Sequence, residues 1–399
     1  MPAPARLIDL TRSLRRAGRV PTGVDRVEQA YLAHLIPDEV PVYGIVRTAF
    51  GYLLLDQAGV VAFHDKIAGT QDWARASLLS RLVGRRDVQV QRAESDLRRL
   101  ALARCTPRRL QAMLTRHMPA DFAYYNVGHS NLTDRVLNAV RRAEGRIHVL
   151  IHDVIPLEYP QYQRPHTVAP FRQKLMRVGK WADRVIYNSD DTRRRADALM
   201  QGWGRVPQGI VSHLGTITPL PDPAGMPAHL PPKVPYFITV GTIEPRKNHA
   251  LLLDLWEQMG ADAPPLLICG NRGWENEAVF ARLDALKPDD PVQEIPGLPD
   301  AALACLVQNA AGALFPSHAE GFGLPPVEAL ALGTRVLCND LGVLREILGS
   351  HAHYHPVSER DLWLKTVKAW EKDRPVAING DAFQAQTWVN HFKTVLRSE

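Results

Sequence analysis

Residues 317–328 read Ser-His-Ala-Glu-Gly-Phe-Gly-Leu-Pro-Pro-Val-Glu, and this stretch is the most informative part of the 399-residue chain. The apolar run before it ends at Leu314 and Phe315 and predicts a buried strand, whereas residues 329–331 continue a helical pattern. A strand, a glycine-containing turn and a helix start therefore follow one another. Such an arrangement directs free backbone N–H groups and the positive end of a helix dipole toward one point, which suits a phosphate group.

Two glutamates lie on either side of this turn. Glu320 directly precedes Gly321, and Glu328 follows eight positions after Glu320. Gly321 and Gly323 allow unusual φ angles and a close approach of a ligand to the backbone. The two carboxylates can then accept hydrogen bonds from hydroxyl groups on both sides of a phosphate, and a sugar nucleotide carries such hydroxyls on its sugar and its ribose. The alternative interpretation is that the two acids only complement the dipole of a helix start.

The turn and the residues after it, Ala-Leu-Gly-Thr-Arg-Val-Leu-Cys-Asn-Asp at 331–340, resemble the Glu-x7-Glu signature of retaining glycosyltransferases. The resemblance is to family 4 with the GT-B fold, in particular to enzymes of bacterial surface-polysaccharide assembly. It implies that Glu320 lies at the donor sugar as a catalytic residue and that Glu328 binds the ribose. It also implies donor contacts from the turn itself, through Gly321, Phe322, Gly323 and Leu324. The motifs cover residues 236–348 well, but the resemblance is thin before them.

The composition is that of an ordinary soluble globular protein, with 45% hydrophobic and 23% charged residues. A chain of this length is expected to form two domains. Residues 1–10 show no long apolar segment of the kind found in signal peptides, and the apolar runs are too short to span a bilayer. The four cysteines lack the spacing of a metal site. We therefore expect a cytoplasmic protein with free thiols and with no metal or other cofactor.

The net charge of +6 is unevenly distributed, since residues 75–116 contain eleven arginines and three acidic residues. Apolar residues recur within this stretch at roughly helical spacing, namely Leu97, Leu100, Leu110, Met113 and Leu114. One interpretation is a basic amphipathic face that contacts an anionic membrane or a lipid-diphosphate acceptor, which would place the protein peripherally on the inner face of the cell membrane. The other is a solvated helix surface. A nucleic-acid partner is not expected, because aromatic residues do not alternate with the basic ones.

A stretch with seven prolines, residues 216–235, divides the chain and reads as a linker. On both sides of it, apolar segments of strand length alternate with helical patterns, which indicates parallel, doubly wound sheets. The predicted strands are 5–10, 122–127, 147–151 and 184–187 before the linker, and 236–240, 265–269, 292–295, 313–315 and 335–338 after it. The predicted helices are 25–35, 171–181, 249–259, 277–286, 300–310, 326–332 and 382–396.

These patterns predict an α/β protein with two Rossmann-like domains, residues 1–215 and 236–385. The resemblance implies that the first domain binds the acceptor and the second the nucleotide sugar. The resemblance implies that the two domains face each other across a central cleft, as in the GT-B fold. Open α/β sheets bind ligands beyond the carboxyl ends of their strands, so the active site is expected in that cleft. We expect the C-terminal helix, in residues 386–399, to cross back to the first domain.

A second charged loop follows the predicted strand 236–240. Arg246 and Lys247 stand side by side before a helix, where two cations can neutralise a diphosphate leaving group. The resemblance implies this catalytic role for both residues. Several relatives carry an arginine where this chain has Thr242, a position expected to contact the donor. The alternative is a solvated basic pair, although a helix dipole disfavours cations at a helix start.

Three further residues enter through the resemblance. His152 follows a predicted strand, at a position where relatives carry a histidine beside the reacting carbon of the donor sugar. Gly23 belongs to a loop that approaches the diphosphate from the first domain, and Leu298 to a loop that packs against the nucleobase. Without the resemblance, His152 would read as a structural histidine and Gly23 as an ordinary turn residue.

The predicted activity is metal-independent transfer of a hexosyl group from a nucleotide sugar to an acceptor hydroxyl, with retention of configuration. GDP-mannose is the favoured donor; dTDP-rhamnose, GDP-fucose and UDP-sugars are the alternatives. A glycan, in particular a lipid-diphosphate-linked oligosaccharide of surface polysaccharide synthesis, is the expected acceptor. Two other interpretations stay open: a non-catalytic sugar-nucleotide-binding or scaffold protein, and a nucleotide-sugar epimerase on the same fold. The chain has no G-x-G-x-x-G sequence, which argues against a dinucleotide oxidoreductase.

Overall fold

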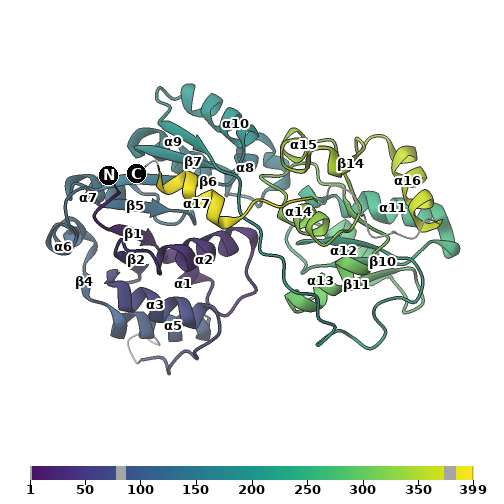
Figure 1. Ribbon diagram of the computed structural model, residues 1–399, viewed down its shortest axis with the longest axis horizontal. Coiled ribbons are helices and arrows are strands. Elements are labelled where there is room, and N and C mark those ends of the chain that lie inside the picture. The colour runs from purple at the N-terminus through teal and green to yellow at the C-terminus, as the bar shows by residue number, and fades with distance from the viewer. Residues whose placement is uncertain (1, 78–86, 373–382, 398) are drawn as a thin grey trace.

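The computed structural model describes residues 2–77, 87–372, 383–397 and 399. The chain forms two α/β lobes, which lie side by side in Figure 1. The first lobe is built on an eight-stranded sheet and the second on a six-stranded sheet. Two α/β units with largely parallel sheets are the fold class that the sequence predicts.

The sheet of the first lobe has the strand order β4-β3-β2-β1-β5-β6-β7-β8. Its strands are β1 (Arg6–Asp9), β2 (Val42–Thr48), β3 (Gly51–Leu55), β4 (Ala103–Cys105), β5 (Ala123–Asn126), β6 (Arg146–Ile151), β7 (Arg184–Tyr187) and β8 (Gln208–Val211). The pairs from β2 through β1 and β5 to β8 are parallel. The four strands predicted before the linker are confirmed as β1, β5, β6 and β7.

The prediction of a wholly parallel sheet is wrong at one edge, where β3 pairs antiparallel with both β2 and β4. Thr48 and Gly51 are paired across a two-residue loop, which can join only antiparallel strands. Gly51 has a φ of +140°, and a Cβ atom there would lie 2.0 Å from the carbonyl oxygen of Cys105. Glycine is therefore required where these strands meet.

The sheet of the second lobe has the order β11-β10-β9-β12-β13-β14, and all of its pairs are parallel. Its strands are β9 (Phe237–Val240), β10 (Leu266–Cys269), β11 (Val292–Ile295), β12 (Gly312–Phe315), β13 (Val336–Cys338) and β14 (His353–Tyr354). The five strands predicted after the linker are confirmed, and the short β14 is added at the edge. Because the central strands are covered by helices on both faces, they read as continuous apolar runs.

Helices surround both sheets. In the first lobe they are α1 (Thr11–Arg15), α2 (Gly23–Leu35), α3 (Gln57–Ile67), α5 (Val88–Leu100), α6 (Leu110–His117), α7 (Asp134–Arg142), α8 (Ile155–Glu158), α9 (Val168–Trp181) and α10 (Asp190–Gln201). In the second they are α11 (His249–Met259), α12 (Glu277–Asp284), α13 (Asp300–Asn309), α14 (Leu324–Ala331), α15 (Gly342–Leu348) and α16 (Arg360–Lys372). The six helices predicted before residue 340 are confirmed, with bounds that differ by a few residues.

The last helix, α17 (Trp388–Leu396), begins later than predicted. Residue 382 lies outside the described part of the chain, and residues 383–387 are not helical. Two hydrogen bonds explain the later start. The side chain of Thr387 accepts one from Asn390 N and so caps the helix, and the backbone N–H of Thr216 donates one to Gln386 O at 2.9 Å. The segment before the cap is thus held by the connecting chain and cannot join the helix.

Helix α17 packs on the first lobe, next to α2 (Figure 1). His391 Nε2 lies 3.0 Å from the hydroxyl of Tyr31, and the ring of Phe392 stacks on His34 at 3.9 Å. Residues 212–236, all of them described, contain no helix or strand. We therefore propose the division into residues 1–215, a connecting segment 216–235, residues 236–385, and a C-terminal segment that belongs with the first lobe.

The basic stretch 75–116 is not one amphipathic helix. Residues 78–86 lie outside the described part, and the remainder is divided among α5, β4, a short 3-10 helix (Pro107–Arg109) and α6. Of the apolar residues that suggested a membrane-facing stripe, Leu97, Leu110 and Leu114 are buried in the core. The helical spacing is therefore explained by packing inside the lobe. Within the described residues, no helix combines the length and apolar character needed to cross a membrane.

Candidate active site

The site is built around the loop that joins β12 to α14. Gly323 is the N-cap residue of α14, with a φ of +90°, and a Cβ atom there would lie 2.6 Å from Leu344 Cδ2. Glycine is therefore required by both conformation and space. Pro325 and Pro326 carry no N–H group, so the amide donors at this helix start can come only from Gly323, Leu324 and the turn before them.

Glu320 is the centre of a buried ion cluster. It is 6% exposed; its Oε1 accepts from Lys247 Nζ at 2.6 Å and its Oε2 from Arg246 Nη1 at 2.8 Å. Burial alone would raise the pKa of Glu320, but the two cations outweigh it and hold the pKa at about 2. Glu320 is therefore ionised throughout the physiological pH range. The structure brings together three of the four residues predicted to be catalytic.

The loop after β9 positions the two cations. Arg246 is fixed by Glu244, whose Oε1 accepts from Arg246 Nε at 3.0 Å and Nη2 at 2.6 Å, while Arg246 Nη1 also donates to the carbonyl of Ala319 at 2.7 Å. Gly241, with a φ of +145°, ends β9. A Cβ atom at Gly241 would lie 3.5 Å from Lys247 Cε, so the Lys247 side chain passes over this glycine and reaches Glu320.

Glu328 lies on α14 and is bound by a residue of the other lobe. Arg26 Nη1 lies 3.1 Å from Glu328 Oε1, and Arg26 Nη2 lies 3.0 Å from Asp300 Oδ1. Burial and, to a smaller extent, the charge of Asp300 raise the pKa of Glu328 to about 7 against the opposing effect of Arg26. The carboxylate predicted to bind the ribose is thus close to its titration point at neutral pH, and the facing cation favours its charged form.

His152 lies at the end of β6, directly opposite the glycine turn. A Cβ atom at Gly321 would lie 2.6 Å from the carbonyl oxygen of His152 and 2.9 Å from Asp153 Cβ. His152 Nε2 lies 2.7 Å from the carbonyl oxygen of Val127, so this nitrogen carries the proton of the neutral ring. Burial lowers the pKa of His152 to about 4. At neutral pH it can act as a hydrogen-bonding group but not as a cation.

Two other residues predicted to bind the donor are Gly23 and Phe322, which lie at the start of α2 and in the glycine turn. Gly23 is the first residue of α2, and a Cβ atom there would lie 3.6 Å from Leu324 Cδ1, the first residue of α14. The starts of these two helices therefore meet across the lobes. The side chain of Phe322 is buried in the core and lies edge-on to His213, which leaves its backbone for any contact with a ligand.

Thr242 and Leu298 occupy loops at the carboxyl ends of β9 and β11. The methyl group of Thr242 would lie 2.8 Å from a Cβ atom at Gly273, so Thr242 packs against the loop after β10. Leu298 is partly buried against the apolar core and follows Gly297, which has a φ of +72°. Both positions lie beyond the carboxyl ends of strands, which is where open α/β sheets bind their ligands.

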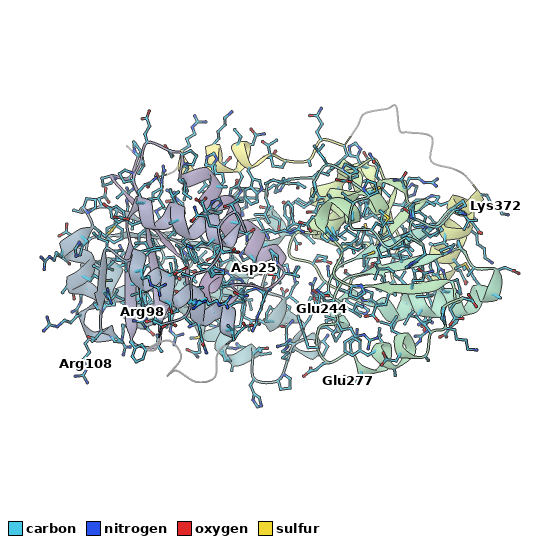
Figure 2. The ribbon with its side chains drawn as sticks, turned by 90° about the horizontal axis from the view of Figure 1, so that it is seen from below. Asp25, Arg98, Arg108, Glu244, Glu277 and Lys372 are labelled. Atoms are coloured by element: carbon cyan, nitrogen blue, oxygen red, sulfur yellow. The ribbon has the colours of Figure 1, made fainter. Side chains whose placement is uncertain are left out.

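Two contacts between the lobes lie close to the turn. Glu346 of α15 accepts hydrogen bonds from the backbone N–H groups of Asp190 and Asp191 at the start of α10, at 2.6 and 2.9 Å. Tyr162 stacks on His318 with ring centroids 5.1 Å apart. Figure 2 shows Asp25 and Glu244 on the sides of the two lobes that face each other. The site thus forms where two separately folded sheets meet.

Sequence reasoning missed Arg26, Glu244 and Glu346. Glu244 had a local signal, because a carboxylate two residues before Arg246 can orient its guanidinium. Arg26 had none, since its partners Glu328 and Asp300 lie 302 and 274 positions away. Among the described residues, no group of three or more His, Cys, Asp or Glu side chains is arranged to hold a metal ion.

The fold and the second lobe define the class of protein. Residues 227–378 match the family model described as glycosyl transferases group 1. The whole chain superimposes on Anabaena HepE, crystallised in complex with UDP-glucose, with a TM-score of 0.65 over 99% of this chain and 98% of that one, at 13% identity. The chain therefore has the GT-B fold, and its second lobe matches the glycosyl transferases group 1 model. The predicted family resemblance is confirmed.

The chain is also similar in sequence to individual enzymes. The chain is 28% identical over 250 residues to the serotype-specific mannosyltransferase WbdA of Escherichia coli, an alignment that covers 59% of this chain and 31% of WbdA. It is 32% identical over 117 residues to the O-antigen chain mannosyltransferase B of Escherichia coli, covering 29% of this chain and 31% of that enzyme. The chain thus spans about a third of the length of these relatives.

Proposed function

We propose that the chain is a hexosyltransferase that moves a sugar, with mannose favoured, from a nucleotide sugar to an acceptor hydroxyl. The observation that carries the proposal is the Glu320 cluster. A buried carboxylate held by Lys247 and Arg246 lies beside the glycine turn at the start of α14. Glu320 would accept hydrogen bonds from hydroxyls of the donor sugar, and Glu328 would bind the ribose.

The hydrogen bonds of Arg246 and Lys247 suggest different roles for the two cations. Arg246 has five N–H donors, and its bonds to Glu244, Ala319 and Glu320 already use four of them. Lys247 has three donors and uses one on Glu320. We therefore assign direct neutralisation of the leaving diphosphate chiefly to Lys247, with the amides of residues 321–324. Arg246 would mainly fix the position of Glu320.

Two features of the reaction follow from this arrangement as proposals. The two cations and the helix start supply positive charge at the diphosphate, so the reaction is expected to proceed without a metal ion. Transfer would occur with retention, the acceptor attacking on the face from which the diphosphate leaves. His152, neutral and opposite the turn, would hydrogen-bond to the donor sugar near the reacting carbon.

The partners are proposed from the relatives. WbdA and the O-antigen chain mannosyltransferase B are named as mannosyltransferases, which favours GDP-mannose as the donor here; dTDP-rhamnose, GDP-fucose and UDP-sugars remain the alternatives to test. The acceptor would be a growing glycan of surface polysaccharide synthesis, carried on a lipid diphosphate. Such an acceptor would bring the protein to the inner face of the membrane.

The test is titration of the purified protein with GDP, UDP and dTDP and their sugar conjugates, followed by a transfer assay with the nucleotide that binds. A specific nucleotide at about a hundred times its Kd should stabilise the folded state by about 2.7 kcal/mol. Glu277, exposed on α12 (labelled in Figure 2), provides the matched control, since Glu277→Gln should bind and turn over normally whereas Glu320→Gln should not. Donor binding without transfer to any glycan would favour the scaffold interpretation. Interconversion of the free donor into an isomer would favour the epimerase.

A further inference from the structure

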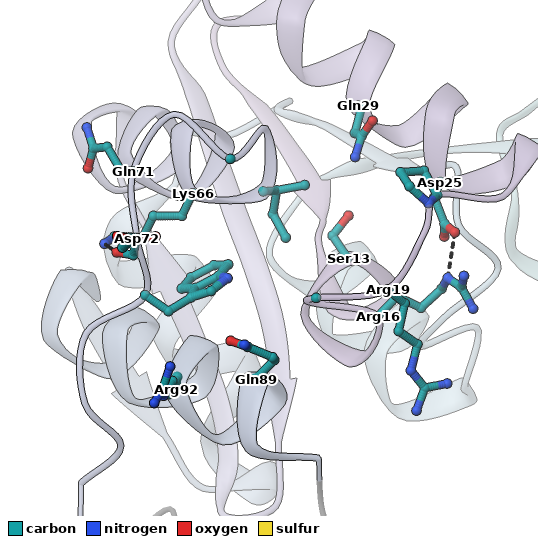
Figure 3. A pocket seen from close by; sticks show the side chains of 15 residues that line it. Ser13, Arg16, Arg19, Asp25, Gln29, Lys66, Gln71, Asp72, Gln89 and Arg92 are labelled. Carbon is teal, nitrogen blue, oxygen red and sulfur yellow. Dashed lines mark hydrogen bonds and ion pairs between the residues drawn. The ribbon is translucent and has the colours of Figure 1, made fainter. Parts of the chain in front are cut away.

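The proposed reaction does not account for a cavity of about 500 Å³ in the first lobe. Figure 3 shows it between the loop that joins α1 to α2, helix α3 with the segment after it, and helix α5. Four basic side chains line it, together with an indole ring and amide groups; the principal residues are Arg16, Arg19, Lys66, Trp73, Gln89 and Arg92. We call this cavity the basic pocket.

The charges of the basic pocket are not balanced within the protein. Among the residues that the structure describes, the side chains of Arg19 and Arg92 make no hydrogen bond or ion pair. Asp25, an acid in the lining, accepts from Arg12 Nε at 2.7 Å and is also paired with Arg16. The charge of Asp25 is therefore already neutralised, and the second carboxylate of the lining, Asp72, is exposed, so four cations face two acids. Arg92 on α5 and Arg19 in the α1–α2 loop lie on opposite sides of the pocket (Figure 3), and both can donate charge-assisted hydrogen bonds to a phosphate that enters between them.

Contacts between neighbouring elements fix the walls of the pocket. Gly18 has a φ of +79°, and a Cβ atom there would lie 2.6 Å from Gln89 Cγ, so the α1–α2 loop rests directly on α5. Lys66 is held by Asp96 at 3.3 Å and lies 5.7 Å above the ring of Trp73. The indole ring and the partly buried Ile67 add an apolar part to the lining.

The basic pocket adjoins the cleft that contains the donor site. Pro21 and Asp25 line the pocket, and Gly23 between them contacts Leu324 at the start of α14. One short loop therefore separates the basic pocket from the place assigned to the donor diphosphate. A molecule bound in the pocket can extend around this loop toward the donor sugar.

We propose that the basic pocket binds the phosphate or diphosphate group of a phosphorylated glycan acceptor, while the acceptor hydroxyl reaches into the cleft. This inference rests on the proposed glycosyltransferase function. Arg19 and Arg92 bind the phosphate oxygens, and Trp73 and Ile67 contact the apolar part of the acceptor. The same phosphate chemistry occurs in a lipid-diphosphate carrier and in a glycan that bears phosphate as a substituent.

The test uses the full chain with its donor site saturated by the nucleoside diphosphate that binds best. Added phosphate compounds then cannot occupy the donor site. Calorimetric titrations then use three probes: decyl diphosphate, mannose 6-phosphate and the neutral decyl mannoside. The variants are Arg19→Ala, Arg92→Ala and the double variant. Arg108→Ala is the control, because Arg108 is an exposed arginine at the far end of the first lobe (Figure 2).

The expected result is binding of a phosphorylated probe but not of the neutral one, weakened about tenfold or more by either pocket substitution and unchanged in Arg108→Ala. Preference for decyl diphosphate identifies a lipid carrier, and preference for mannose 6-phosphate identifies a phosphorylated glycan. Equal binding by the double variant, or no binding of either phosphate by the unmodified protein, would overturn the inference. In both of those cases nucleotide binding, measured beforehand on the same proteins with the donor site empty, still tests the proposed function separately.

Discussion

Arg26 of the first lobe holds Glu328 of the second, with Nη1 and Oε1 3.1 Å apart, and the same guanidinium reaches Asp300. The carboxylate proposed to bind the ribose is thus paired with a residue of the other lobe. Arg26 therefore links the closure of the two lobes to the charge of Glu328. This cation has the opposite effect to burial and to Asp300, both of which favour the protonated acid.

The first prediction concerns the pH dependence of nucleotide binding. In the proposed function, ionised Glu328 would accept hydrogen bonds from the ribose, so nucleotide affinity should fall as the pH decreases through about 7. In Arg26→Ala the pKa of Glu328 rises, and the loss of affinity should shift to higher pH. Arg26→Lys keeps the charge and should retain most of the original profile. Calorimetric titration between pH 6 and about 8.5 measures the shift; identical profiles for the three proteins would exclude this role for Arg26.

A second prediction concerns the contribution of Glu320 to turnover and its lack of titration in the assay range. The pKa of Glu320 is held at about 2, so no acid limb of the rate profile should arise from it within the usual assay range. Glu320→Gln should reduce turnover about a hundredfold to a thousandfold, since the amide cannot pair with both cations or accept from the sugar as strongly. Glu277→Gln is the control. Near-normal turnover in Glu320→Gln, with an unchanged circular dichroism spectrum, would contradict the assignment.

Lys247→Ala provides a third test, because Lys247 retains two N–H donors that no carboxylate uses. The variant should bind the nucleoside diphosphate about tenfold more weakly and the corresponding nucleoside with unchanged affinity. Lys365, exposed on α16, provides a control lysine whose replacement by alanine should change neither affinity. An equal loss for nucleoside and diphosphate would show that Lys247 acts through the fold of the loop.

A fourth prediction concerns the glycine at the helix start. Gly323→Ala places a side chain at a φ of +90° and against Leu344, whereas Gly333→Ala meets a φ of +81° with no atom within 4 Å. Conformation should cost both variants about 1 to 2 kcal/mol of unfolding free energy. Displacement of Leu344 should cost Gly323→Ala about 1 to 3 kcal/mol more. Urea unfolding compares the two, and equal losses would show that Leu344 moves freely.

Strands β9 to β13 and helices α11 to α14 of the second lobe could be predicted from the sequence, because their apolar runs and helix periods are local properties; β14, α15 and α16 were not predicted. The same holds for the Glu320 turn, where strand, glycines and helix start are adjacent. The antiparallel edge of the first sheet was not predicted, since β3 and β4 are short and pair through contacts between distant residues. The start of α17 was misplaced because backbone contacts from residue 216 fix it.

The α/β class, the place of the glycine turn and the types of residue around it can be read from the sequence alone. Which of these residues meet depends on the fold: Lys247 and Arg246 at Glu320, His152 opposite Gly321, and Arg26 at Glu328. Packing within the second lobe brings the first pair of cations to their carboxylate, and packing between the lobes makes the other two contacts, because the partners are far apart in the chain. The sequence carries no periodic signal for such pairs. The basic pocket is likewise a property of packing, because its walls come from three segments that are separate in the chain.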